Sequence, residues 1–297
     1  MSHTGVHSSN AKPKWKIAGC LLIFALLPFP LGLPLAADGD SHEAPAPAVR
    51  WEILDMGLEM GFLSSPQPAE IGDSVIRVLR VDPQHFRIRL LNASATADKE
   101  ALTAKQWCRR NGLIAAINAS MYQADYLTSV SLMRTRDHIN NRHFSKDMSI
   151  LAFDRLSEDV PPVKIIDRQC DDFEQLKVKY GSLVQSIRMI SCTGQNVWRQ
   201  QPRKHSTAAI AVDSDDRLLL IHVGSLYTTH DLVNILQALP LDISRAMYTE
   251  GGPQAQLHVR YGSKVYNFAG GYEMNFIEGD GAALYRPVPN VIGIAPK

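Results

Sequence analysis

Two adjacent glycines, Gly251 and Gly252, interrupt a strand-like part of the chain near its C-terminal end. The apolar segment before them ends in one carboxylate, Glu250, and alternating apolar and polar residues resume after Gln254. Glycine adopts positive φ angles and lets the backbone approach other groups closely, so we expect a sharp turn between two strands. A carboxylate at such a turn is well placed for acid, base or binding chemistry, although a double glycine also marks simple hairpins.

Short strand-like segments outnumber helical ones along the chain. Strands are expected at 75–81, 86–91, 113–117, 148–153, 163–166, 183–189, 208–212, 218–223 and 291–295, and helices at 103–111, 171–180 and 232–239. The elements follow no strict βαβ rhythm, and no internal repeat is visible. This pattern predicts an α+β (mixed α/β) fold, a single domain with mixed β-sheets flanked by helices.

The N-terminal 37 residues read as a targeting segment rather than as part of the fold. Lys12, Lys14 and Lys16 precede a charge-free apolar run at 17–35, and small residues follow at 36–37. These features predict a signal peptide at 1–37, with an uncleaved N-terminal anchor as the alternative. We expect a flexible Pro/Ala linker at 38–50 and a folded domain at 51–297. The protein is then exported, periplasmic or extracellular, and meets a membrane only through an uncleaved N-terminal segment.

Composition and motif spacing exclude several classes of partner. The formal net charge is +1, and no basic run with interleaved aromatic residues is present, so nucleic acid is not an expected partner. The glycine patterns of nucleotide-binding loops are absent, and no His or Cys spacing typical of zinc sites occurs. The sequence therefore predicts neither a cofactor nor a metal site.

Three cysteines follow the targeting segment. Cys170 and Cys192 flank one unit of helix followed by strand, whereas Cys108 lies in the expected helix at 103–111. Export makes a disulfide possible, and an odd number leaves one thiol over. We expect a Cys170–Cys192 disulfide with Cys108 reduced and buried.

Polar residues at strand ends are the other candidates for a site. Asn118 follows the buried strand at 113–117, where it is either a ligand-binding residue or a turn former. Arg188, on the strand at 183–189, offers a fork of donors to a phosphate or carboxylate, or is a half-exposed strand arginine.

His205 and Ser206 precede the apolar strand at 208–212 and introduce a second titratable group. His205 is a candidate acid or base. A serine-hydrolase triad of Ser206, His205 and Asp231 is disfavoured, because the Gly-x-Ser-x-Gly motif is absent. Asp231 also has a structural interpretation, because Thr228 three residues before it resembles a helix capping box.

The order of these segments resembles the phosphodiester glycosidase family over about residues 70–296. Residues 113–122 resemble its strand ending in Asn-Gly-Gly-Met-Phe, with Ser120 in place of a glycine, and 206–213 resemble its Arg-Thr-Ala segment, where His205 and Ser206 replace an arginine. Residues 248–254 resemble its Leu-Asp-Gly-Gly-Gly-Ser-Ser turn. Glu250 replaces the aspartate there, and Pro253 replaces the third glycine. This Glu-Gly-Gly-Pro variant is similar to a bacterial exported subgroup.

The resemblance implies a hydrolase that cleaves a sugar phosphodiester or a related glycosidic bond in an envelope or extracellular glycan. Glu250 would be the acid, base or nucleophile, with His205 or Asp231 as the second titrating group. The implied substrate-binding residues are Asn118, Arg188, Ser206, Gly251, Gly252 and Asn290. The alternative is a non-catalytic protein of the envelope that binds glycan or polysaccharide, in which Trp198 and Tyr272 serve as aromatic platforms. Either way the expected partner is a carbohydrate or sugar phosphate.

Overall fold

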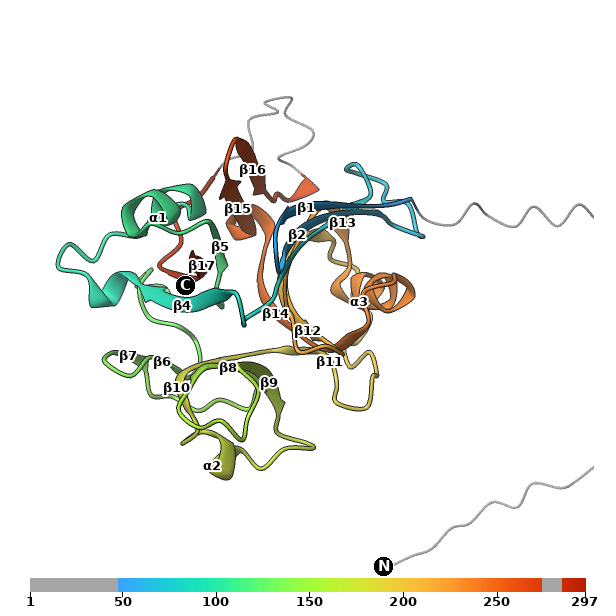
Figure 1. The fold of residues 1–297 in the computed structure, drawn as a ribbon. Helices are drawn as coiled ribbons and strands as arrows, with labels where there is room; N and C mark the ends of the chain where they lie inside the picture. Colours follow the sequence, from blue (N-terminus) through green and yellow to red (C-terminus); the bar gives the residue numbers. More distant parts are fainter. Residues whose placement is uncertain (1–47, 274–284) are drawn as a thin grey trace, which may run out of the picture. The chain divides into compact units, whose positions relative to one another are not determined.

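Antiparallel β-sheets dominate the computed structural model, which describes residues 48–273 and 285–297 (Figure 1). The first sheet has seven strands in the order β1-β2-β3-β13-β12-β14-β11. Its strands are β1 (Val49–Asp55), β2 (Leu58–Ser64), β3 (Val75–Val81), β13 (Leu218–Tyr227), β12 (His205–Asp213), β14 (Ile243–Gly251) and β11 (Arg188–Ile190). The β-branched apolar residues of β3 and the hairpin turn between β12 and β13 explain why the sequence predicted these three strands, whereas β1 and β2 were not expected.

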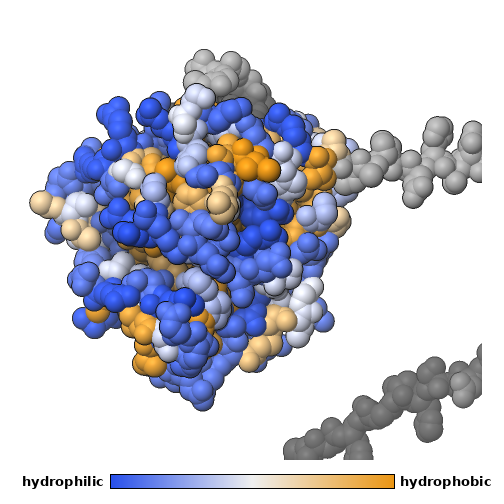
Figure 2. All heavy atoms as spheres, in the orientation of Figure 1, coloured by the Kyte–Doolittle hydropathy of each residue, from blue (hydrophilic) through white to orange (hydrophobic). Residues whose placement is uncertain are grey.

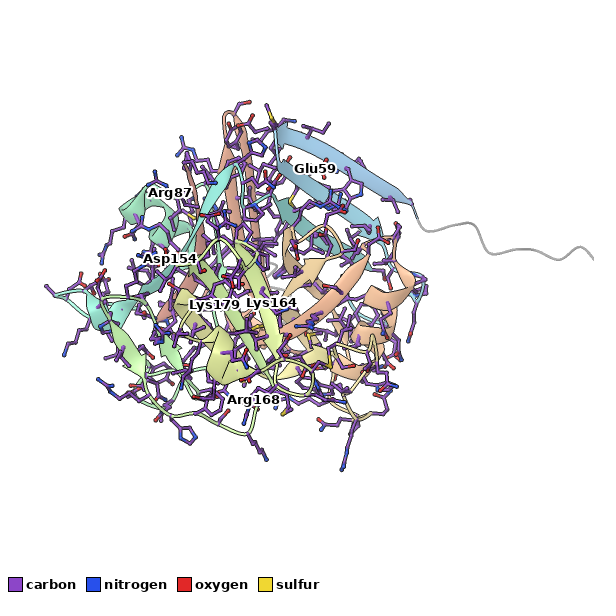
Figure 3. All side chains as sticks on the ribbon, turned by 60° about the horizontal axis from the view of Figure 1, so that its bottom comes forward. Glu59, Arg87, Asp154, Lys164, Arg168 and Lys179 are labelled. Carbon is purple, nitrogen blue, oxygen red and sulfur yellow. A yellow bond between two sulfur atoms is a disulfide. The ribbon has the colours of Figure 1, made fainter. Side chains whose placement is uncertain are left out.

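Two five-stranded sheets complete the fold. The second sheet consists of β7 (Ile139–Asn141), β6 (Met133–Arg134), β10 (Tyr180–Ser186), β8 (Ser149–Arg155) and β9 (Val163–Asp167), and Figure 3 shows charged side chains such as Asp154, Lys164 and Lys179 on and beside it. The third consists of β16 (Lys264–Ala269), β15 (Gln256–Tyr261), β5 (Ala115–Asn118), β17 (Asn290–Pro296) and β4 (Phe86–Asn92). The segment Pro45–Lys297 is one compact unit.

Helices are few and short. The helical elements are α1 (Ala104–Asn111), α2 (Phe173–Leu176), α3 (Thr229–Ala238) and the 3-10 turns η1 (Ala93–Ala95) and η2 (Gly252–Gln254). All pairings between the described strands are antiparallel, so the expectation of mixed sheets was wrong. The helices flank the sheets only in part. Parallel pairs need long crossover connections, and these short helices do not supply them. Within residues 48–273 and 285–297 no helix has the length and hydropathy needed to cross a membrane.

Helix α1 shows how local sequence fixes an element. Thr103 accepts a hydrogen bond from the backbone of Gln106, whose side chain accepts one from Thr103 N–H, and this capping box starts the helix. Gly112 ends it in the left-handed conformation with φ of 63°. The helix expected at 103–111 is thus confirmed.

Other elements differ from expectation. The helix expected at 171–180 is only the single turn α2, because Tyr180 is buried as the first residue of β10. The strand expected at 183–189 is divided between β10 and β11 at Ile187. Folded structure begins with β1 at Val49, two residues before the expected start, while the targeting segment at 1–37 lies outside the described residues.

One hydrophobic core joins the three sheets. Ile210 of the first sheet, Val184 of the second and Ile117 of the third are fully buried members of the same cluster. The opposite face of the first sheet packs against α3, which contributes Leu232 and Leu236 to a second cluster. The site described next lies at the end of β14, where this central sheet meets the loops that follow β5 and β16.

Candidate functional site

Glu250 lies near the end of β14, beside a break in the strand pairing. Ala208 of β12 pairs with Glu250, but Ala209 pairs with Tyr248, so Thr249 forms a β-bulge. The backbone N–H of Gly251 donates a hydrogen bond of 3.1 Å to Oε1 of Glu250. Burial raises the pKa of Glu250 to about 7, and this one hydrogen bond only partly opposes the rise. The carboxyl group therefore exchanges protons near neutral pH.

The two glycines are required by the side chains packed over them. A Cβ at Gly251 would overlap the hydroxyl of Tyr248 and the ring of His205. A Cβ at Gly252, whose φ is 66°, would overlap the ring of Tyr272. Aromatic rings therefore pack closely against both glycines of the turn.

His205 and Tyr248 meet over Gly251. Nε2 of His205 lies 3.4 Å from the Tyr248 hydroxyl. Burial, together with the nearby Arg203 guanidinium, lowers the pKa of His205 to about 4, so the imidazole is neutral at neutral pH. Its Nδ1 is buried and has no hydrogen-bond partner among the described residues. Trp198 also packs against Tyr248, with ring centroids 5.3 Å apart.

Tyr122 links Glu250 to the loop after β5. Burial raises the pKa of the Tyr122 phenol, and the negative charge of Glu250 raises it further. A hydrogen bond with Gln254 and the positive charge of Arg286 act in the opposite direction. Segments that are distant in the sequence therefore place Glu250, Gln254 and Arg286 around the Tyr122 phenol.

Two arginines give the site a positive charge. The Arg203 guanidinium lies 5.1 Å from the ring centroid of Tyr272. Neither Arg203 nor Arg286 forms an ion pair within the part of the chain that the structure describes, whereas Lys204 pairs with Glu70 at 2.8 Å. Arg203 thus lies near Tyr272 and His205, and Arg286 lies near Tyr122, each without a carboxylate partner among the described residues.

Asn118 and Ser206 lie close to the turn, in the strands beside it. Oδ1 of Asn118 accepts a bond of 3.3 Å from the backbone of Gln256, two residues after η2, while its buried Nδ2 has no partner in the described structure. The Ser206 hydroxyl donates to Gly224 O at 2.6 Å and accepts from Gly271 N–H at 2.8 Å. Asn118 therefore retains a free donor, whereas Ser206 holds the segment after β16 in place.

The remaining candidates have structural partners away from Glu250. The Asp231 carboxylate accepts bonds from Thr228 and from the Gln200 side chain at the start of α3. Asn290, the first residue of β17, accepts a bond of 2.7 Å from Asn92. The capping interpretation of Asp231 therefore matches the structure, and Asn290 belongs to a buried amide pair.

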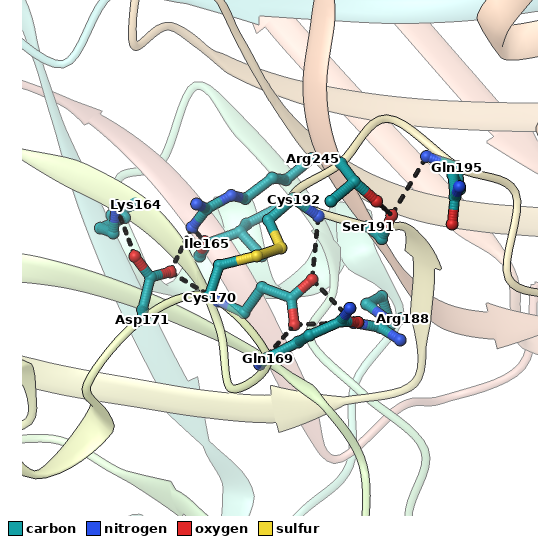
Figure 4. Close-up of a disulfide and its surroundings, with 12 residues drawn as sticks. Lys164, Ile165, Gln169, Cys170, Asp171, Arg188, Ser191, Cys192, Gln195 and Arg245 are labelled. Atoms are coloured by element: carbon teal, nitrogen blue, oxygen red, sulfur yellow. Dashed lines mark hydrogen bonds and ion pairs between the residues drawn. A yellow bond between two sulfur atoms is a disulfide. The ribbon is translucent and has the colours of Figure 1, made fainter.

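Arg188 lies beside the disulfide rather than beside Glu250 (Figure 4). Its guanidinium donates to both carboxylate oxygens of Asp167, at 2.8 and 2.9 Å, and Cys192 N–H donates to the same carboxylate at 2.9 Å. The Cys170–Cys192 disulfide is confirmed, with Cα atoms 6.4 Å apart. Cys108 is free and buried, and burial raises the pKa of its thiol to about 12.

Sequence reasoning gave no role to Tyr122, Tyr248 or Arg286. Tyr122 and Tyr248 lie inside two of the three segments that carry the family resemblance, so their positions were a usable signal. Nothing in the local sequence marks Arg286. No group of three or more His, Cys, Asp or Glu residues that could hold a metal ion occurs among residues 48–273 and 285–297.

The sequence profile of the phosphodiester glycosidase family matches residues 111–295, more than half of the chain. The chain belongs to this family. The match includes Glu250, both glycines of the turn, His205 and Asn118. No curated protein sequence matches the chain significantly.

Solved structures of other proteins share the fold. A hypothetical protein from Synechocystis matches with a TM-score of 0.57 at 14% identity, over 86% of this chain and 65% of that one. The catalytic domain of zebrafish N-acetylglucosamine-1-phosphodiester alpha-N-acetylglucosaminidase, auto-inhibited by its pro-peptide, matches with a TM-score of 0.53 at 11% identity. That match covers 86% of this chain and 85% of the zebrafish chain. At these identities the likeness concerns the fold. The chain spans about two thirds of the length of the Synechocystis protein.

Proposed function

We propose that this protein hydrolyses a sugar phosphodiester, with Glu250 as the general base. The observation that carries the proposal is the burial of Glu250 at a glycine turn, which raises its pKa to about 7. A carboxylate of that basicity takes a proton from water far better than an ordinary glutamate does. Membership of the phosphodiester glycosidase family and the activity named for the zebrafish enzyme support the same chemistry.

In the proposed reaction water attacks the anomeric carbon. The water oxygen bonds to that carbon as Glu250 accepts its proton. The bond from the anomeric carbon to the phosphate oxygen breaks, and the electron pair leaves with the phosphomonoester. Arg203 and Arg286 would bind the phosphate, since neither is neutralised by a carboxylate of the described chain. The free Nδ2 of Asn118 would donate to a sugar hydroxyl.

His205 would bind rather than transfer protons in this scheme. Because its pKa is lowered to about 4, it stays neutral and offers its unpaired Nδ1 to a sugar hydroxyl. We assign no substrate contact to Arg188, Ser206, Asp231 or Asn290, because each already bonds protein groups. The backbone of Gly251 and Gly252 would form the wall beside the leaving group.

We place this activity outside the cytoplasm. A disulfide persists in oxidising compartments, so Cys170–Cys192 supports export to the periplasm or the cell exterior. The substrate would then be an envelope or extracellular glycan that carries a phosphodiester.

The test compares wild type with Glu250→Gln on a panel of sugar-1-phosphodiesters, with Glu158→Gln as control because Glu158 is 87% exposed. We expect Glu250→Gln to lower kcat by about 10²-fold or more while the control stays unchanged. Turnover that survives Glu250→Gln would refute the assigned base. Saturable binding without turnover by wild type would instead identify a non-catalytic glycan-binding protein.

A further inference from the structure

A cavity lies on the second sheet, and Glu250 is not among the residues that line it. It has a volume of about 590 Å³, which is within the range of small-molecule sites. Figure 2 shows apolar surface in the lower part of the view, where Figure 1 draws β10 and α2. The apolar side chains that line the cavity are Leu132, Phe144, Leu156, Phe173, Val178 and Leu183.

The apolar lining is partly open to solvent. Val178 is 66% exposed, Leu156 is 51% exposed and Phe144 is 39% exposed. Phe144 stacks on Phe173 at 4.7 Å, which fixes one wall of the cavity. Exposed apolar side chains gathered in one concave place indicate a binding site more strongly than the same side chains scattered singly.

Arg134 gives this cavity a charge without a counter-ion. Its guanidinium donates to the backbone carbonyls of Lys177, Tyr180 and Gly181 at 2.9 to 3.2 Å. No ion pair within residues 48–273 and 285–297 includes it, and its Nε–H and one Nη1–H have no partner there. Arg134 is half-buried, and desolvation lowers the pKa of its guanidinium, in contrast to the ion-paired Arg136, whose pKa is raised.

The neighbouring charges leave the rim positive. Arg136 also lines the cavity and is paired with Asp154 at 2.7 Å, and Lys177 is paired with Glu174. Gly181 of β10 has no side chain, and this leaves room for the Arg136–Asp154 ion pair to pack against the strand backbone. Among the described residues that line the cavity, Arg134 is thus the cation without a carboxylate partner, and the hollow is mainly apolar.

We propose that this cavity binds a single-chain anionic amphiphile of the fatty acid class. The alkyl chain would lie on the apolar lining, and burying it supplies most of the binding free energy. The carboxylate would accept the unpaired N–H groups of Arg134, a charge-assisted contact that gives the site its preference for anions. This site is independent of the proposed hydrolysis at Glu250.

The test titrates the full chain with monomeric dodecanoate by calorimetry, with dodecyltrimethylammonium as the probe of opposite charge. We expect saturable one-to-one binding of dodecanoate and at least tenfold weaker binding of the cation. Val178→Asp should weaken dodecanoate binding at least tenfold. Ile53→Asp, a change at an apolar side chain that is 75% exposed elsewhere, should leave it unchanged.

Arg134→Gln should reduce the preference for dodecanoate over dodecanol, while Arg134→Lys should retain part of it. Equal binding of the anionic and cationic probes would overturn the proposal, as would dodecanoate binding that survives Val178→Asp. Val178 is largely exposed, so Val178→Asp should leave the fold intact. This variant therefore tests the proposal even if the Arg134 variants do not fold.

Discussion

The hydroxyl of Tyr248 lies 3.4 Å from Nε2 of His205, and both side chains rest on Gly251, immediately after Glu250. Burial raises the pKa of Tyr248 and lowers the pKa of His205, so both partners are neutral at neutral pH. The carboxyl group of Glu250 is thereby left as the group of this cluster that titrates near pH 7. The pH dependence of the site should follow that one carboxyl group.

Activity should rise with pH and level off above about 7. A general base works only when ionised, and the pKa of Glu250 is about 7, so kcat/KM should increase about tenfold per pH unit below that value. Initial rates between about pH 4.5 and 9 measure this. His205→Gln should keep the same midpoint, because the pKa of His205 is lowered to about 4. A rate that falls as pH rises through 7 would assign Glu250 as an acid instead.

Stability should respond to Glu250 in the opposite direction. The folded-state pKa of Glu250 is raised above that of an unfolded chain, so its contribution is fully present in acid and is lost as pH rises through about 7. Glu250→Gln should therefore raise the free energy of unfolding at about pH 8.5, by up to about 3 kcal/mol, and change it little at about pH 4. Urea unfolding at both pH values measures this. An equal change at both would show that Glu250 is not desolvated.

Local sequence patterns predicted much of the fold but little of its tertiary arrangement. The capping box of Thr103 and the β-branched residues of β3 act within a few neighbours, so the sequence predicted those elements. The length of helix α2 was overestimated. Tyr180 is buried in β10 instead of extending the helix, and helix propensity does not include that tertiary packing. The antiparallel order of the sheets depends on pairings between strands far apart in the chain.

The sequence likewise predicted only part of the candidate site. The carboxylate at the double-glycine turn was visible in the sequence, because glycine and acid are adjacent there. Arg188 was a reasonable candidate phosphate ligand from the sequence. Its ion pair with Asp167 could not be foreseen, because that partner lies 21 positions away in the chain. Arg286 could not be found from neighbouring residues, since only the fold brings it to Tyr122.

Gly252→Ala should disturb the turn by two separable effects. The φ of 66° costs an alanine about 1 kcal/mol, and the new Cβ would overlap the ring of Tyr272. We expect a loss of stability that Tyr272→Ala in the same chain relieves only in part, because the backbone strain remains. Thermal unfolding of both single variants and the double variant measures the coupling. Strictly additive effects would show that the ring does not constrain Gly252.

Removing the disulfide should destabilise the protein without altering the site. Cys170 and Cys192 are 22 positions apart, and a loop of that size contributes about 3 kcal/mol in the chain-entropy model. Replacing both cysteines by serine should lower the free energy of unfolding by that amount and leave KM unchanged. Cys108→Ala is the control: it keeps the disulfide, so reductant should lower its stability as it lowers that of wild type. A changed KM in the variant without the disulfide would couple this region to substrate binding.

Arg188→Gln and Arg203→Gln should have opposite effects on stability and binding. The Arg188 side chain is 14% exposed and its partner Asp167 is 1% exposed, so removing this cation leaves a buried carboxylate and should cost about 3 kcal/mol of stability with KM unchanged. Arg203 is exposed, and its loss should raise KM for a sugar phosphodiester about tenfold, with stability retained. Unfolding curves and steady-state kinetics on both variants measure the contrast. If Arg188→Gln raises KM while the unfolding curve stays in place, Arg188 contacts the phosphate as the sequence alone suggested.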